Sequence, residues 1–330
     1  MPSQSPPFSD HPRCTVTGEP RHVGVEIELA GLGVEALSSL VAASVDGRVE
    51  RLSRYEHRII GDARGDWGVE LDFAFLKRRG RRSGNDGVPE DALEAMIRLG
   101  AEQLVPVEVV SPPLPIDELG GVDRLIESLR RAGARGTGDG LTYAFGLQLN
   151  PELPALDATT VTRYLQAFLC LHDWLKERAR VDLTRRLTAY IDPFPRDYVR
   201  RVIDPGYTPG LATLADDYLA ANPSRNRALD LLPLLAHIDR ERVRAAVDDP
   251  RIKPRPALHY RLPNSEVGRP GWGIMAAWAD WLAVERLAAD PSRLAGVCTA
   301  YAEHLDQPLS GLVHPWSEQA GTWLDVPDAP

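Results

Sequence analysis

Two glutamates, Glu26 and Glu28, lie two positions apart in an otherwise apolar stretch that reads RHVGVEIELAG over residues 21–31. Apolar and other residues alternate there with a period of two, which is typical of a strand with two unlike faces. Both carboxylates would then lie on one face, about 6.5–7 Å apart. A solvated acidic face would explain this single strand equally well, because water and salt screen the repulsion between the charges.

Four further stretches show the same alternation, each with an apolar side and a side of small or polar residues. Their polar residues are Glu70 and Asp72 in GVELDFAF, Glu108 in VPVEVVS, Gln148 and Asn150 in YAFGLQLN, and His259 and Arg261 in ALHYRL. If these strands share one sheet, the acids at positions 26, 28, 70, 72 and 108 meet on one surface. Gly24, Gly68 and Gly146 lie on the same side and leave room for a ligand.

Acids gathered in this way, with almost no fixed cation among them, would repel one another. Divalent metal ions remove that repulsion, and hard oxygen ligands suit Mg²⁺ or Mn²⁺. Gln148 and His259 would add ligands, and Arg261 would add a cation that binds an anion. The sequence therefore favours a metal site on this face over an ordinary solvated face.

Helices must hold these strands in place, and the remaining apolar periodicity predicts them. Residues 37–45 suit one face of a short helix, 116–133 read as helical, and most of 157–250 is helical. The stretch KRRGRRSGNDG, residues 77–87, is basic and rich in glycine. It is typical of a solvated loop, and a mobile lid that meets a polyanionic ligand is the alternative.

Composition excludes several classes of function. The 330 residues carry a formal net charge of −9, which argues against a general nucleic-acid binder. Cys14, Cys170 and Cys298 are too widely spaced for a disulfide framework, so we expect a reducing compartment, the cytoplasm. No apolar run approaches the ~18–20 residues that span a bilayer, so no membrane partner is expected. Residues 1–20 lack a signal-peptide pattern and are expected to be a disordered leader.

The motifs GVEIEL, GVELD, EVVSPPLP, FGLQLNPE and PALHYRLPN, followed by a tryptophan-containing helix, together resemble the amidoligase family. That family belongs to the glutamine synthetase and glutamate–cysteine ligase superfamily of carboxylate–amine ligases. The resemblance extends from about residue 21 to 290. It implies an α+β fold: a curved, mainly antiparallel sheet forming a half-barrel, with helices on the convex face and the active site on the concave face. We then expect one catalytic domain over 21–305, a helical insertion over about 157–250 and a C-terminal tail over 306–330.

The resemblance also implies an ATP-dependent reaction, in which a carboxylate is phosphorylated and an amine attacks the acyl phosphate. The substrates would be small-molecule or peptide carboxylates and amines, and Mg²⁺ (or Mn²⁺) would hold the phosphates. The implied metal ligands are Glu26, Glu28, Glu70, Glu108, Gln148 and His259. The implied nucleotide-binding residues are Glu108, Gln148, Asn150, Arg255 and Arg261, and the implied catalytic residues are Arg261, Glu70 and Asp72.

Two motifs depart from the family pattern. The fourth strand of the family reads G-x-H-x-H or G-x-H-x-N, and here GLQLN places Gln148 where the metal-binding histidine stands. The last strand reads T-[VI]-E-F-R, and here ALHYR places His259 at the glutamate and keeps Arg261. A histidine lost at one place and gained at the other is consistent with an exchange of ligands in an active ligase. A relative that binds nucleotide without ligating, and a metal-dependent hydrolase, are the alternatives.

Overall fold

The computed structural model describes residues 12–71, 106–138, 145–179, 191–307 and 315–324. The described strands pair into a nine-stranded antiparallel sheet in the order β2-β3-β4-β5-β1-β7-β9-β8, with β6 pairing to β1, and this path is open. The strands are β1 (His22–Leu29), β2 (Arg48–Arg51), β3 (Glu56–Ile60), β4 (Trp67–Leu71), β5 (Val107–Val110), β6 (Leu114–Pro115), β7 (Leu147–Pro151), β8 (Leu229–Asp230) and β9 (His259–Tyr260). The α+β class with an antiparallel sheet is thus confirmed, and the half-barrel curvature stays a prediction.

Contacts between Cα atoms divide the chain into two compact units. One, here called the sheet unit, comprises His22–Leu149 and Pro263–Ala276. The other, here called the helical unit, comprises Met1–Arg21, Asn150–Leu262 and Ala277–Pro330. Across the described part of both units, no helix combines the length and the apolar character that crossing a membrane requires.

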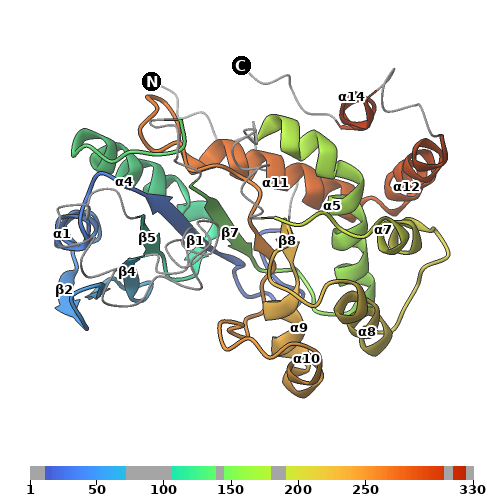
Figure 1. Ribbon diagram of the computed structural model, residues 1–330, viewed down its shortest axis with the longest axis horizontal. Coiled ribbons are helices and arrows are strands. Elements are labelled where there is room, and N and C mark those ends of the chain that lie inside the picture. Colours follow the sequence, from blue (N-terminus) through green and yellow to red (C-terminus); the bar gives the residue numbers. More distant parts are fainter. Residues whose placement is uncertain (1–11, 72–105, 139–144, 180–190, 308–314, 325–330) are drawn as a thin grey trace, which may run out of the picture. The chain divides into compact units, whose positions relative to one another are not determined.

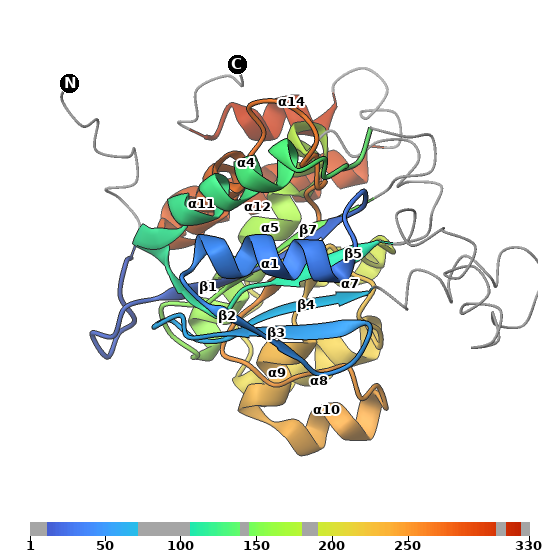
Figure 2. The same ribbon diagram turned by 90° about the vertical axis from the view of Figure 1, so that its left-hand side faces the viewer.

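The sheet unit has one face covered by helices. Along β1, Val23, Val25, Ile27 and Leu29 are at most 1% exposed, whereas their neighbours Gly24 and Glu26 are half-buried. Helices α1 (Val34–Ser44) and α4 (Gly120–Arg131) turn their buried leucines and valines inward. Figure 2 shows the two helices beside each other over the strands, and both contacts, α1 with β3 and α1 with α4, are present. The face of Glu26 is therefore the one that α1 and α4 leave open.

The hairpin of β2 and β3 forms the edge of the sheet unit, with Arg48 paired to Ile60 and Arg51 paired to His57. The sequence GRVERLSRYEHRIIG, residues 47–61, predicts a polar hairpin here, and the structure confirms it. The final strand differs from its prediction. Of residues 256–264, only His259–Tyr260 belong to β9. Pro256 and Pro263 flank this segment, and proline has no amide hydrogen with which to extend a ladder.

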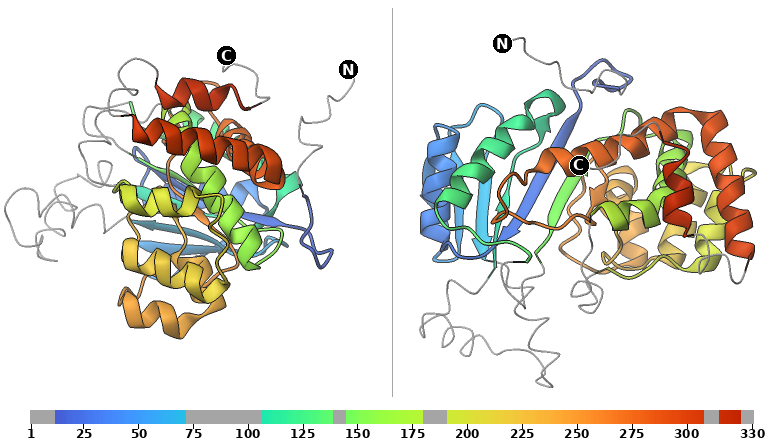
Figure 3. Two further views of the ribbon diagram at one scale, coloured as in Figure 1. Left: turned by 90° about the vertical axis from the view of Figure 1, so that its right-hand side faces the viewer. Right: turned by 90° about the horizontal axis from the view of Figure 1, so that it is seen from above.

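The helical unit packs around a long helix, α5 (Ala158–Arg178). Asp157 caps its start, because the Asp157 side chain accepts a hydrogen bond from the amide of Thr160 at 2.9 Å. The other helices of the described unit are α7 (Arg196–Ile203), α8 (Leu211–Ala221), α9 (Leu232–Ile238), α10 (Arg240–Ala246), α11 (Ile274–Ala289, whose first residues belong to the sheet unit), α12 (Pro291–Asp306) and α14 (Trp316–Gly321). Figure 3 shows α12 and α14, in red, against α5, in green, as their contacts require.

A buried ion pair ties the segment before β1 to α11 within the helical unit. Arg21 donates to both carboxylate oxygens of Glu285, at 2.6 and 3.0 Å, and both side chains are inaccessible to solvent. Arg21 also donates to the carbonyl oxygen of Glu152, and the Trp281 indole donates to Glu285 at 2.9 Å. The pair is therefore fully hydrogen-bonded, which is the condition under which a buried charge is tolerated.

Candidate active site

A line of four carboxylates crosses the open face of the sheet unit, and we call it the acid row. Cα pairing places Glu28 of β1 opposite Glu108 of β5, Glu108 opposite Glu70 of β4, and Glu70 opposite Glu56 of β3. Directly opposite residues in antiparallel strands share a face, with Cβ atoms about 4.5–5.5 Å apart. Figure 1 shows β4, β5 and β1 next to one another, as this register requires. The acids of strands distant in the sequence therefore do meet on one surface.

Glu26 lies on the same face as Glu28, because residues two apart on a strand point the same way. Its partner across the strands is Val110, and Val110 is in turn opposite Gly68. Gly68 adds no side chain to this second line, and a Cβ added there would lie 3.7 Å from Cβ of Val110. Burial falls along the row: Glu28 is 9% exposed, Glu108 is half-buried, and Glu70 and Glu56 are exposed.

Gln148 of β7 joins the two most buried members of the row. Its Nε2 atom donates to Oε1 of Glu28 at 3.2 Å and to Oε1 of Glu108 at 3.3 Å. The amide of Gly146 donates to the other Glu28 oxygen at 2.8 Å. These neutral donors satisfy the carboxylates without cancelling their charge. The amide oxygen of Gln148 is itself a hard oxygen ligand.

The acid row offers oxygen ligands of the kind that bind divalent cations, on residues directly opposite one another in neighbouring strands. Carboxylate and amide oxygens are ligands for Mg²⁺ or Mn²⁺, and like charges directly opposite one another are destabilising without a cation. As the side chains stand, however, no group of three or more His, Cys, Asp or Glu within the described ranges is arranged to hold a metal ion. Side-chain rotations between strands about 4.7–4.9 Å apart would have to complete the site. The metal ligands therefore stay predictions.

His259 lies in the helical unit, where β9 pairs with β8. Its Nδ1 atom is 3.5 Å from Oδ2 of Asp230, the residue directly opposite, and both side chains are at most 1% exposed. The other Asp230 oxygen accepts from the amide of Leu232 at 2.9 Å. A carboxylate at one ring nitrogen fixes the orientation of an imidazole, as it does for metal-binding and catalytic histidines. Asp230 could not be singled out from the sequence, because a two-residue strand has no periodicity.

The remaining predicted nucleotide-binding residues also lie in the helical unit. Nη2 of Arg255 donates to Oδ1 of Asn150 at 2.6 Å, so two residues predicted from separate motifs contact each other. The Arg261 amide donates to the carbonyl oxygen of Ala228 at 2.9 Å, and its Nη1 donates to the carbonyl oxygen of Arg225. Planar guanidinium groups held in this way suit the binding of phosphate or carboxylate groups.

Two of the predicted elements fall outside the described residues: Asp72 and the basic loop 77–87. The described part of the site adds Glu56 and Asp230, which sequence reasoning missed. Glu56 lies in a hairpin rich in charged residues, so its side chain looked like an ordinary solvated one. Only the pairing of β3 with β4 shows that it extends the acid row.

Comparison with known proteins supports the resemblance seen in the motifs. Residues 19–283 match the family described as "Putative amidoligase enzyme". No curated protein and no solved structure was found to match the chain. The family match covers most of the chain and includes all four residues of the acid row. The chain therefore belongs to the amidoligase family.

Proposed function

We propose that this amidoligase is an ATP-dependent carboxylate–amine ligase that forms an amide bond through an acyl phosphate. Family membership supports the formation of amide bonds. The observation that supports the use of ATP and metal is the acid row, in which Glu28, Glu108 and Glu70 are consecutive cross-strand partners. Such a line of like charges on an open sheet face is costly for folding. It becomes favourable once divalent cations and a triphosphate occupy the face.

The proposed reaction balances in two steps. The carboxylate oxygen of the first substrate attacks the γ-phosphorus of ATP, and ADP leaves. The amine of the second substrate then attacks the acyl carbon and gives up one proton. The bond between the acyl carbon and the phosphate oxygen breaks, and inorganic phosphate leaves. Mg²⁺ or Mn²⁺ held within the sheet unit by Glu26, Glu28, Glu70 and Glu108, with Gln148, would neutralise phosphate charge.

The chain's own residues position the reacting groups in this proposal. Arg261 binds the transferring phosphoryl group, since a fixed planar donor stabilises charge that develops there. Arg255, oriented by Asn150, binds the nucleotide. Asp230, with its Oδ2 atom 3.5 Å from Nδ1 of His259, would orient the imidazole. Glu70 and Asp72, from the same stretch, complete the proposed catalytic set.

One observation favours a second candidate, a relative that binds ATP and metal without ligating. The Gln148 amide, which replaces the family's histidine, donates to Glu28 and Glu108 instead of presenting a nitrogen ligand. In this candidate the acid row would still hold nucleotide and metal. No acyl phosphate would form.

Hydroxylamine distinguishes the candidates, because it replaces the unknown amine and converts any acyl phosphate to a hydroxamate. The purified chain is incubated with ATP, Mg²⁺ and hydroxylamine against a panel of amino-acid and short peptide carboxylates. A ligase produces ADP and hydroxamate in equal amounts with at least one carboxylate. A binding protein shows heat of ATP·Mg²⁺ binding by calorimetry and no hydroxamate. Glu108→Gln serves as the control, which should lose the product in the ligase case.

A further inference from the structure

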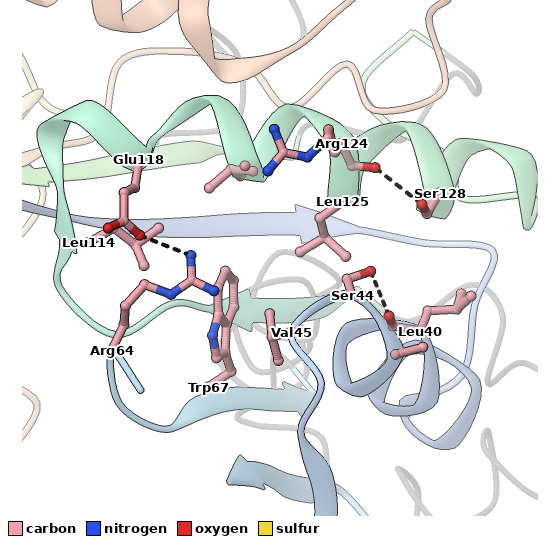
Figure 4. Close-up of a pocket in the computed structure, with 13 residues that line it drawn as sticks. Leu40, Ser44, Val45, Arg64, Trp67, Leu114, Glu118, Arg124, Leu125 and Ser128 are labelled. Carbon is pink, nitrogen blue, oxygen red and sulfur yellow. Dashed lines mark hydrogen bonds and ion pairs between the residues drawn. The ribbon is translucent and has the colours of Figure 1, made fainter. Parts of the chain in front are cut away.

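A cavity of about 380 Å³ lies on the helix-covered side of the sheet unit, between α1, α4 and the start of β4. Figure 4 shows it, with Arg64 and Trp67 at one end and helix α4 along one side. Trp67 and Glu70 differ in parity along β4, and the burial pattern places Trp67 with the residues that face the helices. The cavity is therefore separate from the acid row, which lies on the other face of the strand.

Part of the lining of this cavity is apolar, and the rest is polar. Leu40 and Val45 contribute from α1 and its end, Leu114 from β6, and Leu125 from α4. The Trp67 ring completes this apolar part. A cavity of about 300–1,000 Å³ with an apolar lining and a few polar groups is typical of small-molecule sites.

At one end of the cavity the polar groups are already paired. Nε of Arg64 donates to both oxygens of Asp62, at 2.8 and 3.1 Å, and the Trp67 indole donates to the same carboxylate at 2.8 Å. Nη1 of Arg64 donates to Glu118 at 3.3 Å. Burial would raise the pKa of Asp62, but the bonds from Arg64 and Trp67 outweigh it and lower that pKa. Arg64 therefore serves two acids and is not available to bind an anion.

At the rim of the cavity, Arg124 is a cation without an acidic partner among the described residues. Within the described residues its guanidinium makes no hydrogen bond or ion pair, and the residue is exposed. Its Nη2 atom lies beside Gly121, where even an added Cβ would be 3.6 Å away, so no side chain covers it from that position. The carboxylate of the neighbouring Asp123 accepts instead from the amide of Ile274, at the start of α11, at 2.7 Å.

We propose that this cavity binds a small monocarboxylate with an apolar body, its carboxylate on Arg124 and its body against Trp67, Leu114 and Leu125. Of the two arginines that line the cavity in the described part of the chain, only Arg124 has an unpaired guanidinium, and Asp62 and Glu118 nearby repel additional negative charge. A phosphate or a dicarboxylate is therefore a poorer ligand than a single carboxylate. This site is independent of the proposed ligase reaction, because its residues lie on the opposite face of β4.

Isothermal titration calorimetry with 3-phenylpropanoate, and with the neutral 3-phenylpropanamide, tests the proposal. Wild type should bind the acid at least about tenfold more tightly than the amide, because only the acid offers Arg124 a charged acceptor. Arg124→Gln should remove that difference. Ala43→Trp, which fills the cavity from an exposed position on α1, should abolish binding of both compounds.

Arg131→Gln is the matched control, since Arg131 is an exposed arginine on the same helix that does not line the cavity. It should bind 3-phenylpropanoate as wild type does. Circular dichroism and melting curves establish that all variants are folded. Three results would overturn the proposal: no binding of the acid at about 10 mM, equal binding of acid and amide by wild type, or unchanged binding by folded Arg124→Gln. Turnover of ATP is not part of this readout, so failure of the ligase proposal would not affect it.

Discussion

Glu108 is the residue at which function and stability conflict most directly. A carboxylate stands opposite it on each side, Glu28 on β1 and Glu70 on β4. Among the described residues the side chain that joins it to Glu28 is the Gln148 amide, which carries no charge. Local rules of sheet stability are broken here, and such breaks are expected at functional sites.

Replacing this charge should therefore have opposite effects on stability and activity. Glu108→Gln should raise the free energy of unfolding of the metal-free chain by about 0.2–1 kcal/mol, because two like-charge contacts are removed. The same variant should lose ATP-dependent turnover. Melting curves without metal, and the hydroxamate assay, measure the two effects. Glu127→Gln is the control, because Glu127 pairs with Arg131 at 3.0 Å on α4 and should give no gain in stability. A less stable Glu108→Gln that retains turnover would contradict this account.

Arg261 separates a catalytic role from a structural one. Its Nη1 atom donates to the carbonyl oxygen of Arg225, a bond that a lysine can also make. Arg261→Lys should therefore keep the fold and lower turnover by roughly 10²–10³, the loss typical when a fixed donor to developing charge is removed. Melting temperature and turnover rate measure the two. A lysine variant with unchanged turnover would remove Arg261 from the catalytic residues.

The predictability of the site differs from residue to residue. Parity along the strands was sufficient to place Gln148 with Glu28 and Glu108, because each stretch alternates cleanly. Parity alone could not find Glu56 or Asp230. Their significance depends on which residue stands opposite them, and that register is set by tertiary pairing.

At the scale of elements, the Arg21–Glu285 pair holds the segment before β1 against α11. Glu285→Gln should lower the free energy of unfolding by about 3–5 kcal/mol, because it leaves a buried guanidinium without its counter-charge. Chemical denaturation measures the change. Asp306→Asn is the matched control, because it breaks the exposed ion pair between Asp306 and Arg200. The side chain of Arg200 is 42% exposed and that of Asp306 is 65% exposed, so this change should lower the free energy of unfolding by at most about 1 kcal/mol. Similar losses in the free energy of unfolding for both variants would show that the buried pair stabilises the fold no more than the exposed pair does.

The packing of α5 against α12 fixes the reactivity of the cysteines. Cys170 and Cys298 are buried with their sulfur atoms 3.7 Å apart, and Cys14 is exposed. Burial raises the pKa of the Cys170 thiol well above its usual range, which lowers the thiolate fraction. We expect an aromatic disulfide reagent to modify one thiol rapidly in the native chain and three in denaturant. Cys14→Ser should lose the rapid reaction, and three rapid thiols in the native wild type would contradict this packing.

Helix and hairpin boundaries were more predictable than strand pairing. Apolar periodicity predicts a helix at 37–45, and α1 covers Val34–Ser44. The sequence predicts a longer last strand than the structure has, because alternation of residue types does not show where a ladder ends. The flanking prolines limit the ladder to His259–Tyr260.

At the scale of the whole molecule, stability should depend on pH through His172 of α5. Burial, and then the charge of Lys176, lower the pKa of His172 from 6.5 to about 4. Between these values the unfolded chain binds a proton that the folded chain does not, so stability falls as pH falls from 6.5 toward about 4. The loss is at most about 3 kcal/mol, since each pKa unit corresponds to about 1.36 kcal/mol.

Replacing His172 tests this dependence. His172→Gln cannot take up the proton, so its unfolding free energy should change less between pH 6.5 and 4.5 than that of wild type. Urea denaturation at several pH values measures the slope. Equal slopes for wild type and His172→Gln would contradict the lowered pKa.

The order of motifs along the chain was sufficient to predict the family and the α+β class, because both depend on short segments and their sequence. The strand order β2-β3-β4-β5-β1-β7-β9-β8 was not predictable in this way. It brings β5 between β4 and β1, and a single sequence carries no signal for such long-range pairing.

Transfer of an oxygen label tests the central claim, ligation through an acyl phosphate, most directly. A carboxylate that gives a hydroxamate is prepared with ¹⁸O in the carboxyl group and incubated with ATP, Mg²⁺ and hydroxylamine. Mass spectrometry then measures the isotope content of the released inorganic phosphate. The account predicts one ¹⁸O atom in each phosphate, because the carboxylate oxygen that attacks the γ-phosphorus leaves with the phosphoryl group. Phosphate whose new oxygen comes from water would contradict the account.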